Sequence, residues 1–175
     1  MTVQITKEME DEANKFCEKI IVEKIKENCY KTDHQKLKKR YMTGILAEMA
    51  VLTQIGYSYQ DAELDIGDST DYSHSDLQKI GFFHTGIKCV SAANKYPIIY
   101  KKNKENQIIC ILKDKYVDIL GIATIDLLNN CQSDDYIIDP LLRKKGYKTA
   151  FTGLSQLIPF SLEKLIELEW DYENE

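Results

Sequence analysis

The chain has 175 residues, 43% hydrophobic and 29% charged, a composition typical of a globular protein with one domain. No apolar run approaches the roughly 18 residues that cross a membrane, and the polar, then acidic N-terminus is unlike a signal peptide. Five widely spaced cysteines without a Cys-x-x-Cys pair argue against disulfides and a zinc knuckle, so we expect a protein of the reducing cytoplasm with no membrane contact.

The net charge of −5 is unevenly distributed along the chain. Residues 161–175 carry six acids and one base, which leaves 22 acids and 22 bases in the rest. Residues 57–76 hold six further acids and no base, whereas basic residues gather at 36–40, 101–104 and 143–148. These clusters are compatible with a basic groove for nucleic acid, or with scattered solvated lysines.

Two amphipathic helices are predicted at the start of the chain. Apolar residues recur at three- and four-residue steps over residues 5–28, and again over residues 34–55, where Gly56 ends the helix. Glu48 lies in the centre of the second apolar stripe, one turn from Ile45 and from Leu52. A glutamate is rarely buried without a partner, so Glu48 either reaches solvent at the edge of the stripe, pairs with a lysine, or serves a site.

The polar, acidic stretch 57–75 predicts a loop, and residues 75–90 predict a β-hairpin. Alternation would place Phe83, Thr85, Ile87 and Cys89 on one face and Phe82, His84, Gly86 and Lys88 on the other. We expect Lys88 to sit against a partly buried surface, where an ammonium needs an anion nearby. Asp76, on the preceding strand, is the nearest candidate.

Further along the chain, residues 107–112 predict a central strand, and residues 116–123 a second one. Thr124 is expected to cap a short helix, and a short strand is expected at 136–138, followed by a loop-like basic stretch at 143–148. Ser161 is expected to cap a last helix over 162–170. This order of elements predicts an α/β (α+β) fold with a central mixed four-to-five-stranded sheet flanked by helices.

Glu48, Asp76 and Lys88 converge if the second helix packs on the sheet face that Lys88 shares. Two carboxylates are the hard oxygen ligands that Mg²⁺ prefers, and a lysine beside the metal can orient water or neutralise a phosphate. This set of residues suits phosphodiester hydrolysis. His74, His84 and Cys89 lack the spacing of a zinc site.

Leu46-Ala47-Glu48 on a helix, then Asp76, then Gly86-Ile87-Lys88 resembles the PD-(D/E)XK, or restriction-endonuclease-like, nuclease superfamily. Residues 96–99, 107–123 and 152–160 resemble small nuclease-like proteins of phages and restriction systems. The resemblance implies an αβββαβ core over residues 34–160, with an additional N-terminal helix in 1–33 and a C-terminal helix and acidic tail in 161–175.

The resemblance also implies roles for individual residues. Asp76 matches the first acid and a metal ligand, Glu48 the helical glutamate, and Lys88 the terminal lysine, while the backbone carbonyl of Ile87 would complete a site for Mg²⁺ or Mn²⁺. Gly86 departs from the family, because Asp or Glu normally stands there and glycine supplies no ligand. Either Glu48 takes over or the site is weakened or inactive.

These residues predict a cytoplasmic, metal-dependent DNA endonuclease that can act as a homodimer. The side chains expected to contact DNA are Lys39, Arg40, Lys95, Lys101, Lys102, Arg143, Lys144 and Lys145. Gly86 and the acidic tail favour the alternative, a nuclease-like fold that no longer cuts and instead binds nucleic acid or a protein, such as a phage inhibitor of a host defence system.

Overall fold

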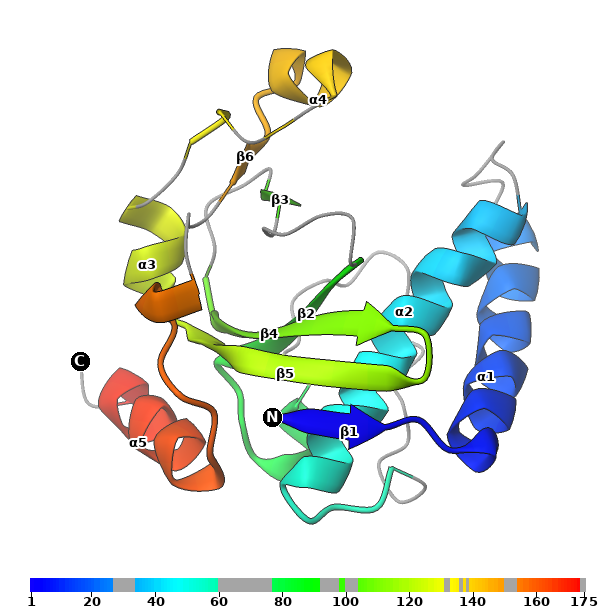
Figure 1. Cartoon of the computed structure of the whole chain (residues 1–175), viewed down its shortest axis with the longest axis horizontal. Coiled ribbons are helices and arrows are strands. Elements are labelled where there is room, and N and C mark those ends of the chain that lie inside the picture. Colours follow the sequence, from blue (N-terminus) through cyan, green and yellow to red (C-terminus); the bar gives the residue numbers. More distant parts are fainter. Residues whose placement is uncertain are drawn as a thin grey trace.

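The computed structural model describes residues 1–26, 34–59, 77–91, 98–99, 104–130, 133–135, 137, 139–149 and 154–173. Its centre is a four-stranded mixed sheet in the order β1-β5-β4-β2 (Figure 1). The strands are β1 (Thr2–Gln4), β2 (Thr85–Ser91), β4 (Asn106–Lys113) and β5 (Tyr116–Ala123). β2 pairs with β4 in parallel, and the other pairs are antiparallel. The predicted mixed sheet flanked by helices is confirmed, and within the described residues this sheet has four strands.

The strands predicted at 107–112 and 116–123 are confirmed as β4 and β5, which pair as a hairpin. Both strands are nearly continuous apolar runs, as expected where other elements cover both faces of a strand. The pairing shifts register between Ile109 and Cys110, opposite Gly121, whose φ is +151°. A Cβ at Gly121 would lie 2.6 Å from the carbonyl oxygen of Ile158, which pairs with Ile122. Glycine at this position therefore allows the segment at Ile158 to cross closely over β5.

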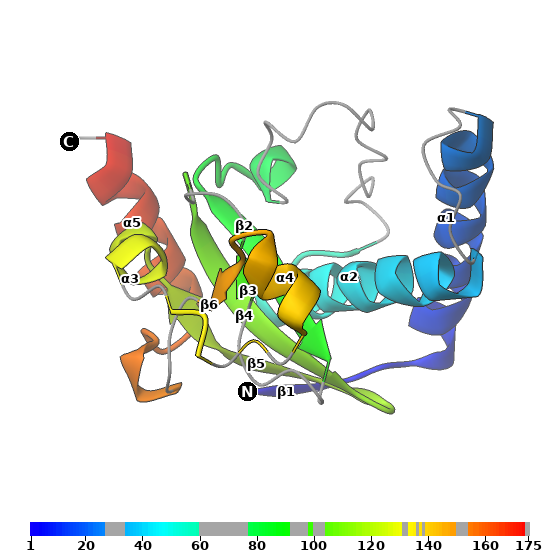
Figure 2. The same cartoon turned by 90° about the horizontal axis from the view of Figure 1, so that it is seen from above.

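Helices α1 (Lys7–Lys26) and α2 (His34–Gln54) lie to the same side of the sheet (Figure 2). Met9, Ala13 and Ile20 of α1 are buried, as the predicted stripe requires, and Cys17 is buried beside them. α2 buries Ile45 and seven other residues, and Gly56, with φ +84°, follows its end as predicted. None of the helices in the described residues is long and apolar enough to span a membrane.

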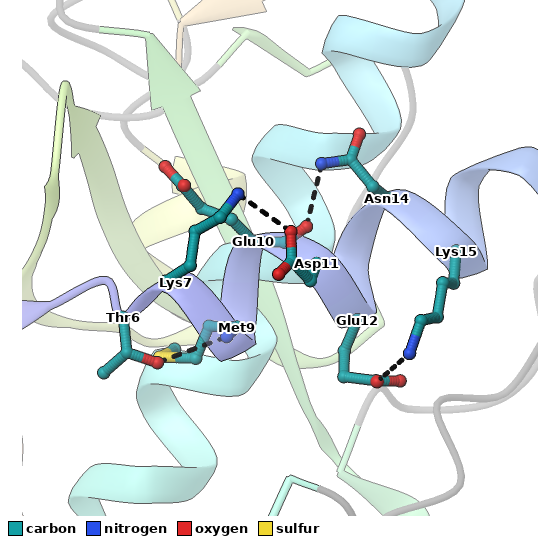
Figure 3. A network of polar contacts seen from close by, with 8 residues as sticks. All are labelled: Thr6, Lys7, Met9, Glu10, Asp11, Glu12, Asn14 and Lys15. Atoms are coloured by element: carbon teal, nitrogen blue, oxygen red, sulfur yellow. Dashed lines mark hydrogen bonds and ion pairs between the residues drawn. The ribbon is translucent and has the colours of Figure 1, made fainter.

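The start of α1 is held by local polar contacts (Figure 3). The Thr6 hydroxyl accepts a hydrogen bond from the Met9 amide at 3.2 Å, which caps the first turn. Lys7 pairs with Asp11 at 2.9 Å and Lys15 with Glu12 at 2.6 Å. These exposed helix pairs contribute a few tenths of a kcal/mol each, so α1 depends mainly on its buried stripe.

The opposite sheet face packs against a smaller group of elements. Leu128 of α3 (Ile125–Asn130) and Leu157, just after the 3₁₀ helix η2 (Leu154–Gln156), join Ile109 and Ala123 in a second core cluster. The Thr124 hydroxyl accepts from the Leu127 amide at 3.2 Å, which confirms the predicted cap. Ser161 likewise caps α5 (Leu162–Glu173). This last helix extends beyond the predicted 162–170.

A second, two-stranded sheet pairs β3 (Ile98–Ile99) with β6 (Lys148–Thr149). It lies with α4 (Pro140–Lys144) beyond the β2 edge of the main sheet (Figure 1). The basic stretch predicted as a loop thus begins in α4, because the Asp139 carboxylate caps the helix and Pro140 suits its first turn. The predicted strand 136–138 is wrong at Ile137, which is buried and outside any strand, while residues 136 and 138 lie outside the described part.

The predicted hairpin at 75–90 is wrong over residues 77–84. A 3₁₀ helix, η1 (Gln78–Ile80), replaces the expected first strand, and Gly81 at φ +92° ends it. Phe82 is buried and Phe83 exposed, and the strand begins only at Thr85. The strand that follows pairs in parallel with β4 rather than with residues just before it. β1 was not predicted, because three residues are too short for a periodic signal.

Candidate functional site

Among the residues that the structure describes, the Lys88 strand, β2, is an edge strand of the main sheet. The Asn106 amide donates to the His84 carbonyl at 2.9 Å, and this bond aligns the starts of β2 and β4. The register that follows places Gly86 beside Gln107 and Lys88 beside Ile109. The buried side chain of Asn106 also accepts from the Ile125 amide at 3.0 Å, so one residue ties β2, β4 and α3 together.

Lys88 and α2 belong to opposite faces of the sheet. Ile87 and Cys89 pack against the core cluster that contains Ile45 of α2, and the partner of Ile87 in β4, Ile108, is in the same cluster. Alternation turns Lys88 to the other face, where Ile109 belongs to the second cluster. The expected packing of α2 on the Lys88 face is therefore wrong. Lys88 is also exposed rather than partly buried.

Gly86 lies against two polar side chains at the start of β4. A Cβ at Gly86 would lie 2.5 Å from Oε1 of Glu105 and 2.8 Å from Nε2 of Gln107. The Gln107 amide donates to the same Glu105 oxygen at 2.8 Å. Glu105 and Gln107 are half-buried, and Gly86 is buried. The position that the resemblance reserves for an acid is thus next to a carboxylate just before β4.

The other predicted catalytic and metal-holding residues are Glu48, Ile87 and Asp76. Glu48 is half-buried between the buried residues Ala47 and Met49, on the helix that covers the opposite face from Lys88. Ile87 is half-buried in β2. Asp76 lies outside the described residues. Of the predicted set, the structure therefore joins Ile87 and Lys88 in one strand and does not bring Glu48 to the Lys88 face.

The predicted DNA-contacting residues fall into three groups. Lys39 and Arg40 are exposed on α2, and Lys144 and Lys145 are exposed at the end of α4. The first turns of α2 and the whole of α4 lie toward the β2 edge of the main sheet (Figure 1). The Arg143 guanidinium donates to the carbonyls of Asp135, at 3.0 Å, and Ile137, so Arg143 holds α4 to the preceding segment. Lys95, Lys101 and Lys102 lie outside the described residues.

The start of β2 is anchored by α5. The buried carboxylate of Glu169 accepts hydrogen bonds from the backbone amides of Phe83 and His84, the latter at 3.0 Å. The His84 ring stacks on Tyr172, with ring centroids 3.7 Å apart. Sequence reasoning assigned Glu169 to an acidic tail and did not single out Glu105 or Gln107. In the sequence, Glu169 lies one helical turn after the apolar Leu165. This spacing was the available signal that Glu169 is buried on the same helix face as Leu165.

Cys89 is a half-buried thiol rather than a reactive one. Burial raises its pKa to about 11, so the thiolate that a nucleophile or a zinc ligand needs is scarce at neutral pH. Within the described ranges, no group of three or more His, Cys, Asp or Glu side chains gathers in a metal-binding arrangement. Mg²⁺, however, often takes one or two carboxylates and completes its shell with water and substrate phosphates. The oxygens beside Gly86 fit that requirement.

Comparisons with protein-family models, with curated proteins and with solved structures gave no match to this chain. The restriction-endonuclease-like arrangement of the core therefore stays a prediction from the residues.

Proposed function

We propose that the chain is a metal-dependent nuclease that hydrolyses phosphodiester bonds of DNA in the cytoplasm. One observation carries the proposal: Lys88 is exposed in the middle of an edge strand, and a carboxylate stands beside Gly86, two residues earlier on the same face. A cation and hard oxygen donors on one open surface are what an anionic phosphodiester and its metal require.

Each group of residues would have a different role in the hydrolysis. Of the metal-holding groups named from the sequence, Asp76 and the Ile87 carbonyl would hold Mg²⁺ or Mn²⁺ beside Lys88, where the ion would neutralise charge on the phosphate. Glu48 lies on the helix that covers the opposite face and is not part of this set. Lys88 would hold the phosphate or the attacking water. Hydrolysis adds water across one P–O bond, leaving a phosphomonoester on one strand end and a hydroxyl on the other. The exposed bases of α2 and α4 would contact the DNA backbone.

The test is cleavage of plasmid and of single-stranded DNA with Mg²⁺, Mn²⁺ or a chelator. We expect metal-dependent cutting that falls by at least about a hundredfold in Lys88→Ala, since removing one transition-state donor costs on the order of 10²–10³ in rate. Lys115→Ala is the matched control, because Lys115 is an exposed lysine in the turn after the far end of β4. Absence of cutting by the folded wild-type protein under every condition would reject the proposal.

A second candidate is a nuclease-like protein that binds nucleic acid or a protein without cutting. The packing of α2 on the face opposite Lys88 favours it, because this packing separates the helical glutamate from the lysine. This candidate predicts DNA or protein binding that Lys88→Ala leaves unchanged, with no cleavage product in any metal.

A further inference from the structure

We infer that Glu105, just before β4, supplies the metal-binding carboxylate that Gly86 lacks. The inference rests on the proposed metal-dependent function and deepens it by naming a ligand outside the Asp76–Lys88 segment. It concerns Gly86, where the sequence lacks the acid of the superfamily it resembles.

The position of the carboxylate is the first support. Oε1 of Glu105 lies 2.5 Å from the point where a Cβ of residue 86 would stand. In an aspartate, each carboxylate oxygen is two covalent bonds from its own Cβ, which is a similar separation. The Glu105 carboxylate therefore lies at the distance from this point that the oxygens of an acid at position 86 would have. Because glycine has no side chain, it leaves room for this approach.

The rigidity of the surroundings is the second support. The Asn106 amide bond to the His84 carbonyl, at 2.9 Å, fixes the start of β4 against β2, directly beside Glu105. Gln107, on the same side of β4, donates to the Glu105 carboxylate at 2.8 Å and so orients it. A ligand oriented by a second side chain is typical of metal sites. Lys88 lies two residues along on the face that Gly86 shares, where a phosphate bound to the metal would need a cation.

The inference can be tested by moving the carboxylate from position 105 to position 86. The probe is Mn²⁺ alone, titrated into the full chain without DNA and followed by calorimetry and by its electron paramagnetic resonance signal. We expect Glu105→Ala to weaken Mn²⁺ binding at least about tenfold, since loss of even an outer-shell partner costs on the order of 10- to 100-fold. The double variant Gly86→Asp/Glu105→Ala should recover most of the affinity.

The rescue is sterically reasonable, because the atoms nearest a Cβ at position 86 are the ends of two flexible side chains rather than backbone. Glu12→Gln on exposed α1 controls for the loss of one negative charge. Circular dichroism and thermal unfolding identify any variant that fails to fold, and Glu105→Gln, which keeps the shape of the side chain, replaces Glu105→Ala in that case.

The outcomes separate this inference from the proposed function. If the wild type binds Mn²⁺ and cuts DNA, and Glu105→Gln binds Mn²⁺ equally well, the inference is overturned and the nuclease stands. If Glu105→Gln loses Mn²⁺ binding but the wild type never cuts, the ligand assignment stands and catalysis is rejected. Failure of the wild type to bind Mn²⁺ overturns the ligand assignment and removes the basis of the metal-dependent mechanism.

Discussion

The Asp118 carboxylate joins three strands of the sheet. It accepts a hydrogen bond from the Thr2 hydroxyl of β1 at 2.6 Å and forms an ion pair with Lys113 of β4. The hydrogen bond from Lys113, followed by that from Thr2, holds the pKa of Asp118 below its ordinary value of 3.8. Because the folded-state pKa is lowered, the contribution to stability is complete above 3.8 and is lost as the pH falls through the folded-state value.

Asp118→Asn should therefore destabilise the protein by about 1 kcal/mol at neutral pH, and the difference from wild type should shrink in strongly acidic buffer. Urea unfolding at both pH values measures it. Asp114→Asn, an exposed residue of the adjacent turn at φ +30°, is the control, because Asn tolerates that backbone as well as Asp does. An Asp118→Asn effect that does not change with pH would contradict the assignment.

Residues whose role depends on their chain neighbours were predicted well. Thr124, Ser161 and Gly56 act as the caps and stop expected of them, because a helix end is decided within four or five residues. Glu105 was not predicted. Its importance depends on which strand lies beside Gly86, and no local pattern carries that information.

At the scale of the element, the hairpin predicted at 75–90 shows the same limit. An alternating apolar run identifies β2 as a strand in any pairing, so Thr85–Ser91 was found while its partner was not. Gly81 and Phe82 match a strand pattern in sequence, but the left-handed backbone at Gly81 instead ends η1 and turns Phe82 into the core. Tertiary packing, not the local pattern, therefore determines that these residues form η1 and a turn instead of a strand.

The attachment of α5 to β2 leads to a prediction about stability. Glu169→Ala leaves two backbone amides without their carboxylate, which should cost about 2 kcal/mol. For a chain of this length, that loss lowers the Tm by roughly 4–8 °C. Glu167→Ala is the matched control, because Glu167 is exposed on the same helix and forms an exposed ion pair with Lys164, three residues earlier. Equal Tm values for the two variants would show that Glu169 does not anchor α5.

At the scale of the whole molecule, a net charge of −5 means that any attraction for DNA must come from local basic surfaces. The mixed sheet and its helical layers were predictable from composition and periodicity, since they follow from burying apolar faces. The side of the sheet on which α2 packs was not, because a helix with eight buried residues does not reveal from sequence which sheet face it will cover.

The double variant Lys144→Ala/Lys145→Ala should weaken DNA binding and reduce the slope of log K against log salt by roughly two, since each phosphate contact contributes about 0.9. Fluorescence anisotropy over a salt series measures the slope. Lys7→Ala/Lys15→Ala changes the net charge equally but removes lysines of α1 that pair with carboxylates of the same helix. If the slope of log K against log salt falls equally in the two double variants, the effect comes from net charge and not from α4.

The pairing of β1 with β5 has a consequence for synthesis on the ribosome. Thr2–Gln4 finds its partner in residues 116–118, and the Thr2–Asp118 bond spans a sequence separation of 116 residues. At 5–20 residues per second, those residues follow roughly ten seconds later. During that interval α1 and α2 can form, but Val3 and Ile5, both buried in the finished fold, remain without the strand that covers them. Closure of the sheet at β1 is thus a late event in synthesis that slower translation would delay further.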